Sequence, residues 1–122
     1  MIEPNRLLAR TYTKALELVG HNVMWSNGAQ QAVRIADGQK PDLVLLELQL
    51  VKHNGIAFLY EFRSYPDWQS VPVIIHSMVS PDNLQVNKEV YRRLGISAYL
   101  YKPQTSLKNL VSTIDQMFAL SS

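Results

Sequence analysis

The sequence has 122 residues, of which 47% are hydrophobic and 18% charged, a balance that fits one folded domain and excludes disordered and collagen-like chains. Twelve basic against ten acidic residues give a net charge of only +2, too small to indicate a nucleic-acid-binding protein. The chain has no cysteine for disulfides or thiolate sites, no apolar run near the about 18 residues of a membrane span and no signal-peptide pattern, so we expect a single-domain cytoplasmic protein.

Helical and extended patterns alternate from the start of the chain. Apolar residues at helical spacing predict a helix over residues 5–19. Residues 22–26 form a short strand candidate, because Val and Trp favour extended structure. Ser26 or Asn27 is expected to cap the next helix, which ends at Gly38.

The middle of the chain contains strands that must be buried on both faces. The apolar run at 43–46 has no alternation of polar and apolar residues, which is typical of a parallel sheet. A helix follows over 56–64, and a second buried strand over 71–75. The Ser-Pro pair at 80–81 predicts the start of a helix that runs to about Leu94.

The last strand candidate covers residues 98–101 and is followed by a strongly amphipathic helix. Its apolar stripe consists of Leu107, Leu110, Val111, Ile114, Met117 and Phe118. Strands and helices that alternate in this way require right-handed crossovers and a parallel sheet between two helical layers. The predicted fold class is therefore α/β, doubly wound, with residues 1–122 as one domain and no further domain in this chain.

Four predicted strands end in polar side chains. In open parallel sheets, ligands bind beyond the carboxyl ends of the strands. The residues at those ends are Glu3, Glu47, Ser77 and Lys102. We therefore expect two carboxylates, a hydroxyl and an ammonium to converge on one rim of the sheet.

Several segments together resemble the receiver domain of response regulators, the CheY-like family. Residues 41–47 resemble its third strand and Gly55 its loop glycine, while residues 72–77 resemble its fourth strand with the terminal Thr or Ser. Residues 95–103 resemble its last strand, with the switch aromatic and the Lys-Pro pair. The resemblance implies a flavodoxin-like (βα)5 three-layer sandwich with strand order 2-1-3-4-5, whose first strand is truncated to residues 1–3.

The same resemblance implies roles for the residues at the rim. Glu47 stands at the phospho-acceptor position, where the family has Asp. Lys102 matches the lysine that holds a phosphate oxygen, and Ser77 matches the switch hydroxyl. Tyr99 matches the switch aromatic. In the family, the acceptor and a pair of acids after the first strand also bind Mg²⁺.

Three departures from the family pattern indicate that phosphotransfer is lost. The extra methylene of Glu47 moves its carboxylate by about one C–C bond, beyond the about 0.5 Å that a preorganised site tolerates. Pro4 replaces the second acid, so Glu3 and Glu47 form at most a weak Mg²⁺ site, and no cofactor is expected. Met78 stands where the family usually has a small residue that admits the phosphodonor.

Glu47 is open to two interpretations of equal weight. Its carboxylate can act as a weak mimic of a phosphoryl group and hold a partly active conformation through Lys102 and Ser77. The limit is its charge of −1, against about −1.5 to −2 for a phosphoryl group. Alternatively, Glu47 and Lys102 form a structural ion pair that switches nothing.

The function expected from these residues is that of an atypical receiver, a pseudo-receiver in bacterial two-component (phosphorelay) signalling. We expect it to act by protein–protein contact and not as an enzyme. The alternatives are a receiver that still accepts and hydrolyses a phosphoryl group with Mg²⁺, and a degenerate scaffold. Its expected contact face consists of Tyr91, Arg92, Tyr99, Tyr101 and Lys108.

The expected partners are proteins: a histidine kinase, a phosphotransfer protein or an output protein. Neither nucleic acid nor a membrane is expected as a direct partner. A homodimer is left open, because the short first strand leaves room in the sheet that a second copy or an extra segment could fill.

Two further features receive a structural interpretation with a functional alternative. Arg6, Arg10 and Lys14, spaced by four residues, are expected to form a solvated helix face, with a docking stripe for an acidic partner as the alternative. Trp25 and Trp68 are expected to be packing residues, because no basic groove is expected beside either.

Overall fold

The computed structural model describes residues 1–84 and 86–121, and side chains up to residue 119. The elements in chain order are α1 (Arg6–Leu18), α2 (Ala29–Gly38), β1 (Val44–Leu46), α3 (Gly55–Ser64), the 3₁₀ turn η1 (Pro66–Trp68), β2 (Val73–Ser77), η2 (Pro81–Asn83), α4 (Lys88–Arg93), β3 (Ile96–Tyr101), η3 (Lys102–Gln104) and α5 (Leu107–Ser121). Within the described ranges, no helix is long and apolar enough to cross a membrane.

The sheet is parallel and has the strand order β1-β2-β3. Ile2 extends it by single parallel bridges, on one side to Leu46 in β1 and on the other to Ser26. The five extended segments therefore lie in the predicted order, with residues 1–3 between Ser26 and β1. The two N-terminal segments pair only at these bridges, so the strand predicted over 22–26 is reduced to the bridge at Ser26.

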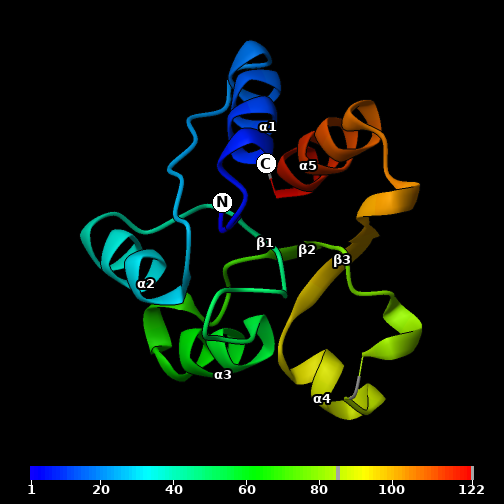
Figure 1. Ribbon diagram of the computed structural model, residues 1–122. Helices are drawn as coiled ribbons and strands as arrows, with labels where there is room; N and C mark the ends of the chain where they lie inside the picture. The colour runs from blue at the N-terminus through cyan, green and yellow to red at the C-terminus, as the bar shows by residue number, and fades with distance from the viewer. Residues whose placement is uncertain (85, 122) are drawn as a thin grey trace.

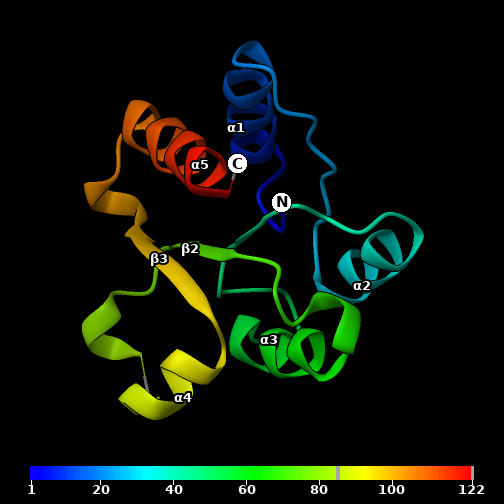
Figure 2. The same cartoon turned by 180° about the vertical axis from the view of Figure 1, so that it is seen from behind.

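Helices cover both faces of the sheet, as Figures 1 and 2 show from opposite sides: α1 and α5 lie on one face, and α2 and α3 on the other. Each helical layer encloses its own apolar core. On the α1 and α5 side, the buried core residues are Leu16, Leu45, Ile74, Leu110 and Ile114. The larger core on the other side includes Leu46, Phe58, Leu59, Phe62, Trp68, Val73 and Ile75. Burial on both faces explains the uninterrupted apolar runs of β1 and β2.

Asparagine side chains fix the starts of three helices. Asn5 accepts a hydrogen bond from the Leu8 N–H at the start of α1, and Asn54 accepts bonds from the first turn of α3. Asn87 caps α4 in the same way, by accepting from the Val90 N–H. A side-chain oxygen satisfies N–H groups that have no partner inside the helix, so each asparagine defines where its helix begins.

The prediction of one continuous helix from Ser80 to Leu94 is wrong, because the structure has a short 3₁₀ turn and a separate helix in this region. Ser80 does cap a helical turn, but that turn is η2 and ends at Asn83, and Leu84 is already extended. The regular helix α4 begins only at Lys88. Asn87 is extended and caps α4, and this local side-chain bond competes with continuation of the earlier turn.

Smaller corrections concern one cap and the strand bounds. The N-cap of α2 is Gly28, not Ser26 or Asn27, and no side-chain cap is formed there. The Ser26 hydroxyl instead donates to the Gly28 carbonyl in the preceding turn. Leu107 does not share the buried stripe of α5, because 42% of it is exposed. The three regular strands begin or end one to two residues away from the predicted 43–46, 71–75 and 98–101.

Candidate functional site

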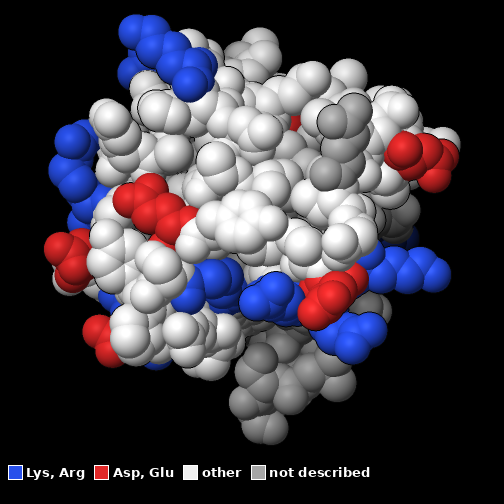
Figure 3. Space-filling model, turned by 90° about the horizontal axis from the view of Figure 1, so that it is seen from below, with Lys and Arg blue, Asp and Glu red and all other residues white. Residues whose placement is uncertain are grey.

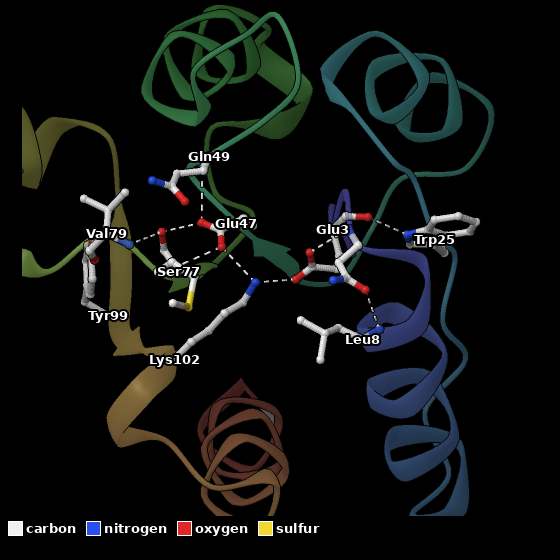
Figure 4. Close-up of polar contacts among 11 residues, drawn as sticks. Glu3, Leu8, Trp25, Glu47, Gln49, Ser77, Val79, Tyr99 and Lys102 are labelled. Atoms are coloured by element: carbon white, nitrogen blue, oxygen red, sulfur yellow. Dashed lines mark hydrogen bonds and ion pairs between the residues drawn. The ribbon is translucent and has the colours of Figure 1, made fainter.

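The carboxyl ends of the sheet strands bring four predicted site residues together. Glu3 follows the Ile2 bridge, Glu47 follows β1, Ser77 is the last residue of β2, and Lys102 follows β3. Their side chains point towards one another across the end of the sheet, as Figure 4 shows. The convergence predicted from the sequence is therefore present, since parallel strands place their carboxyl ends at one edge.

Lys102 bridges the two carboxylates. Its Nζ lies 2.6 Å from Oε1 of Glu3 and 2.8 Å from Oε1 of Glu47. All three side chains are nearly buried, with exposed fractions of 8%, 4% and 3% for Lys102, Glu3 and Glu47. Buried charges are costly unless they are paired and hydrogen-bonded, so each group depends on the others to remain charged in this position.

Both carboxylate oxygens of Glu47 accept further hydrogen bonds. Oε2 accepts from the Ser77 hydroxyl and, at 3.0 Å, from the Gln49 N–H, while Oε1 accepts from the Met78 N–H at 3.1 Å. Burial raises the pKa of Glu47, but bonds to Lys102, Ser77 and Gln49 outweigh burial and hold that pKa below its ordinary value. Glu47 is therefore a buried, ionised carboxylate, and both of its oxygens already accept hydrogen bonds from groups of the protein.

Glu3 is also held by the Asn5 backbone and by the Trp25 side chain. Its Oε2 accepts from the Asn5 N–H at 3.0 Å, and its carbonyl accepts from the Trp25 indole Nε1–H at 2.9 Å. The ammonium of Lys102 is stabilised in turn: burial lowers the pKa of Lys102, but bonds to Glu3 and Glu47 more than offset this and raise it. The lysine stays charged across the physiological range.

A chain of hydrogen bonds leads from Glu47 to Tyr99. The Ser77 hydroxyl donates to Glu47 and accepts from the Val79 N–H at 3.0 Å, and the Tyr99 hydroxyl donates to the Val79 carbonyl at 2.6 Å. Burial and the nearby negative charge of Glu47 raise the pKa of Tyr99 to about 12. The predicted switch residues are thus connected to Glu47 through the loop after β2.

Gly55 has a steric reason to be glycine in the loop after Glu47. A Cβ added at this position would lie 2.7 Å from Cα of Leu48 and 3.2 Å from the Glu47 carbonyl oxygen. Its N–H donates to the Leu48 carbonyl at 2.8 Å. The absence of a side chain lets α3 begin directly against the segment that carries Glu47.

The donor set does not suit Mg²⁺. This cation takes octahedral oxygen ligands, commonly one or two carboxylates with water and substrate oxygens. Here the Lys102 ammonium already lies between the Glu3 and Glu47 carboxylates, and Pro4 offers no side-chain oxygen. Among the described residues, no group of three or more His, Cys, Asp or Glu side chains could hold a metal ion. The predicted weak Mg²⁺ site would require Lys102 to move away.

The structure places two further residues, His76 and Tyr12, beside the charges of the site. His76 packs against the edge of Tyr12, with ring centroids 4.9 Å apart. Burial, assisted by the charge of Lys102, lowers the pKa of His76 to about 4. Tyr12 lies within the helical pattern over residues 5–19, but its approach to β2 depends on tertiary packing that no local pattern contains.

The predicted contact face is only partly exposed. Arg92 on α4 and Lys108 on α5 are exposed, whereas Tyr91, Tyr99 and Tyr101 are partly buried. Its use by a partner stays a prediction.

Comparison with known proteins identifies the family of the whole chain. Residues 1–115 match the model of the response regulator receiver domain. The chain is 32% identical over 103 residues to the KDP operon transcriptional regulatory protein KdpE of Escherichia coli (strain K12). The aligned region covers 84% of this chain and 43% of KdpE. It is 29% identical over 107 residues to protein PilH of Pseudomonas aeruginosa, covering 88% and 85%. The chain therefore spans less than half of KdpE but most of PilH.

Solved structures agree on the fold. The chain resembles a sensor protein from Polaromonas sp. JS666 with a TM-score of 0.84 and 19% identity, over 94% of this chain and 90% of the other. It resembles the receiver domain of Francisella response regulator 1452 with a TM-score of 0.83 and 20% identity, over 99% and 95%. A CheY-like receiver domain from Methylobacillus flagellatus matches with a TM-score of 0.77 and 21% identity, over 94% of this chain and 92% of the other. The predicted CheY-like α/β fold is confirmed.

Proposed function

The chain belongs to the response regulator receiver domain family of two-component signalling, and from this membership we propose that it is an atypical receiver. In this proposal it is not an enzyme. It signals by protein–protein contact, without phosphorylation of a conventional aspartate. Its partners are proteins of a two-component pathway, such as a histidine kinase, a phosphotransfer protein or an output protein.

One observation carries the proposal: Lys102 Nζ lies 2.6 Å from Glu3 and 2.8 Å from Glu47, in a nearly buried bridge. In the family pattern, the lysine and the switch hydroxyl are the groups that contact a phosphoryl group. Here Glu47 accepts bonds from both Lys102 and Ser77. A phosphoryl group would have to displace these bonds and add charge beside two carboxylates that share one cation.

The bonds of Glu47 also support the mimic interpretation over a simple ion pair. A structural ion pair needs only Lys102, whereas Glu47 also accepts from Ser77 and from the N–H of Met78. Through Ser77 and Val79 the contact extends to the Tyr99 hydroxyl. In the proposal, Glu47 therefore holds these switch residues in one arrangement without phosphate, within the limit of its single charge.

The experiment that tests the proposal is an amide-resolved NMR titration with Mg²⁺, followed by beryllofluoride as a phosphoryl mimic. We expect no saturable shift at Glu3, Glu47, Ser77 or Lys102 at millimolar Mg²⁺. Saturable shifts that extend to Tyr99 would contradict the proposal and favour a receiver that still accepts a phosphoryl group.

A matched variant gives the titration a positive control. The double substitution Pro4→Asp, Glu47→Asp supplies the missing second acid and shortens the acceptor, so a carboxylate set for Mg²⁺ is available. We expect this variant to show saturable Mg²⁺ shifts under conditions where the natural sequence shows none.

Glu47→Gln distinguishes the mimic from the ion pair. If Glu47 holds the switch residues, loss of its charge will shift the amides from Ser77 through Val79 to Tyr99. Changes confined to the surroundings of Lys102 and Glu3 would leave only a structural ion pair.

A further inference from the structure

We call the site formed by Glu3, Glu47, Ser77 and Lys102 the strand-end pocket. A groove on the outer side of α1 shares no lining residue with this pocket, although Trp25 in the groove donates a hydrogen bond to the Glu3 carbonyl. It has a volume of about 590 Å³, and we call it the α1 groove. It is lined by Arg6, Ala9, Arg10, Thr13, Lys14, Glu17 and Trp25. The first six residues form one stripe along the helix, and Trp25 comes from the segment that connects α1 to α2. The prediction that no basic groove accompanies Trp25 is therefore wrong.

The cations of the α1 groove have no acidic partner in the described part of the chain. Arg6, Arg10 and Lys14 are exposed, and none of them forms an ion pair there. Their spacing by four residues places them one above the other on the helix. Like charges at this spacing repel one another, so the arrangement costs stability and favours an anionic ligand.

Trp25 gives the groove a fixed wall. Its indole Nε1–H donates to the Glu3 carbonyl at 2.9 Å, and the Arg6 guanidinium lies 5.9 Å from its ring centroid. Ala9 also lines the groove and is buried, with 3% exposed, so its small side chain takes up little of the space of the groove. An aliphatic side chain could pack there while carboxylates reach the cations.

The lower face of the molecule differs from the α1 groove in its distribution of charge among the described residues. Figure 3 looks onto the side that carries α3 and α4 and shows basic and acidic side chains next to one another. In the α1 groove, by contrast, the one carboxylate is Glu17, at the far end of the stripe. Glu17 forms no ion pair with the three cations, so their charge is not compensated by any of the described residues.

We propose that the α1 groove binds an acidic helical segment of a partner protein. The first and last of the three cations are eight positions apart, or about 12 Å along the helix, which corresponds to about two turns of a bound helix with acidic residues at the same spacing. Charge complementarity supplies the attraction, and the space beside Trp25 takes an apolar side chain of the partner.

Nucleic acid fits the same groove less well. A single strand would stack its bases on an aromatic ring, but Arg6 already covers the Trp25 ring. Three cations in a protein of net charge +2 also form a short track for a phosphate backbone. The inference goes beyond the proposed function, because the α1 groove does not include Lys102, Glu47 or Ser77.

The test uses the two tryptophan indole N–H signals of the complete chain in ¹H–¹⁵N NMR spectra. Trp25 lines the groove, whereas Trp68 is buried with 4% exposed in the core beside α3 and serves as an internal reference. The probe is a helical peptide of about twelve residues with glutamate at every fourth position and leucines between. A single-stranded oligothymidylate of equal charge is titrated in parallel.

We expect saturable movement of the Trp25 signal with the peptide while the Trp68 signal stays fixed. Arg10→Glu should weaken peptide binding about tenfold or more, and the matched control Lys108→Glu, on the exposed face of α5, less than twofold. Both residues are exposed, so neither variant endangers the fold.

Three results would overturn the inference. The first is no saturable movement of the Trp25 signal with the peptide, and the second is tighter binding of the oligonucleotide. The third is an equal loss of binding in Arg10→Glu and Lys108→Glu, which would indicate non-specific attraction. None of these results depends on the amides of Ser77 and Met78, which report on the pocket, so failure here is distinguishable from failure of the proposed function.

Discussion

The strand-end pocket and the α1 groove each contain three principal charges, but the charges of the pocket are buried and paired, whereas those of the groove are exposed and unpaired among the described residues. In the pocket, one cation lies between two carboxylates, all nearly buried and hydrogen-bonded to one another. In the groove, Arg6, Arg10 and Lys14 are exposed and unpaired within the described chain. Buried charges must be paired with other groups of the fold, whereas exposed charges are solvated by water and stay available to a binding partner. The pocket is therefore closed by its own residues, and the groove is open to others.

The strongest test of this contrast removes one cation from each region. Lys102→Met leaves Glu3 and Glu47 buried without their shared cation, so we expect the free energy of unfolding to fall by about 3–5 kcal/mol. Lys14→Met removes an exposed cation and should change stability by less than about 0.5 kcal/mol. Urea unfolding of both variants measures the difference. Equal, small effects would mean that the pocket charges are not as interdependent as their geometry indicates.

A second test uses acid. Burial lowers the pKa of His76 from its ordinary value of 6.5 to about 4. As pH falls below 6.5, the unfolded chain binds a proton at this residue that the folded chain resists, so stability decreases towards pH 4, by at most about 1.4 kcal/mol per pH unit. Unfolding measured between pH 7 and 4 should show this slope in the natural sequence.

Two histidine variants test whether His76 causes this decrease of stability with falling pH. His76→Phe keeps a ring against Tyr12 but cannot titrate, so the loss between pH 6.5 and 4 should flatten. His53→Gln, at an exposed position, is the matched control for the removal of a histidine. A slope that survives in His76→Phe would place the titrating group elsewhere. The lowered pKa of Glu47 adds a further loss only below about its ordinary value of 4.5.

A third test removes charge from the centre of the pocket while keeping its shape. Glu47→Gln retains an oxygen that can accept from one donor, but it loses the charge that balances Lys102. We expect a loss of about 2 kcal/mol, the range of a hydrogen bond to a charged group, measured by urea unfolding. Glu61→Gln on the exposed side of α3 is the matched control and should be neutral. A neutral Glu47→Gln would show that Glu3 alone suffices for Lys102.

The smallest effect belongs to the groove. Arg10 has a like charge four residues away on each side, and each such pair costs about 0.2–0.5 kcal/mol. Arg10→Gln should therefore raise stability by about 0.5 kcal/mol at low ionic strength, and the gain should disappear in 1 M salt. The same change at Lys108 serves as the control. No gain at low salt would mean that the three cations do not repel one another measurably.

The pocket could be predicted from the sequence because parallel strands obey a general rule. Glu3, Glu47, Ser77 and Lys102 each end an apolar strand, and parallel topology alone places them on one rim. The pairing of Glu47 with Lys102 and Ser77 was predicted from the sequence and is present. The second contact of Lys102, to Glu3, was not predicted, because the rule does not say which carboxylate oxygens one lysine reaches. The approach of His76 to Tyr12 also depended on how α1 packs against the sheet.

The α1 groove shows where prediction from sequence fails. The stripe of Arg6, Arg10 and Lys14 follows directly from helical spacing, but its opposite wall does not. Trp25 belongs to an irregular segment that pairs with the sheet only at Ser26, so no periodic pattern sets its direction. The prediction of one continuous helix from Ser80 to Leu94 failed for a related reason. The side chain of Asn87 caps α4, and this local hydrogen bond favours a new helix start at Lys88 over continuation of the earlier turn.

The bridge between Glu3 and Lys102 joins residues 99 positions apart in the chain. A ribosome adds about 5–20 residues per second, so the carboxylate of Glu3 leaves the peptidyl transferase centre about 5–20 s before the amine of Lys102 is made. During that interval Glu3 and Glu47 have no common counter-ion, and their burial would bring two like charges together. The rim of the sheet can therefore close only after residue 102 has been made, which places this ion pair after the synthesis of all the strands of the sheet.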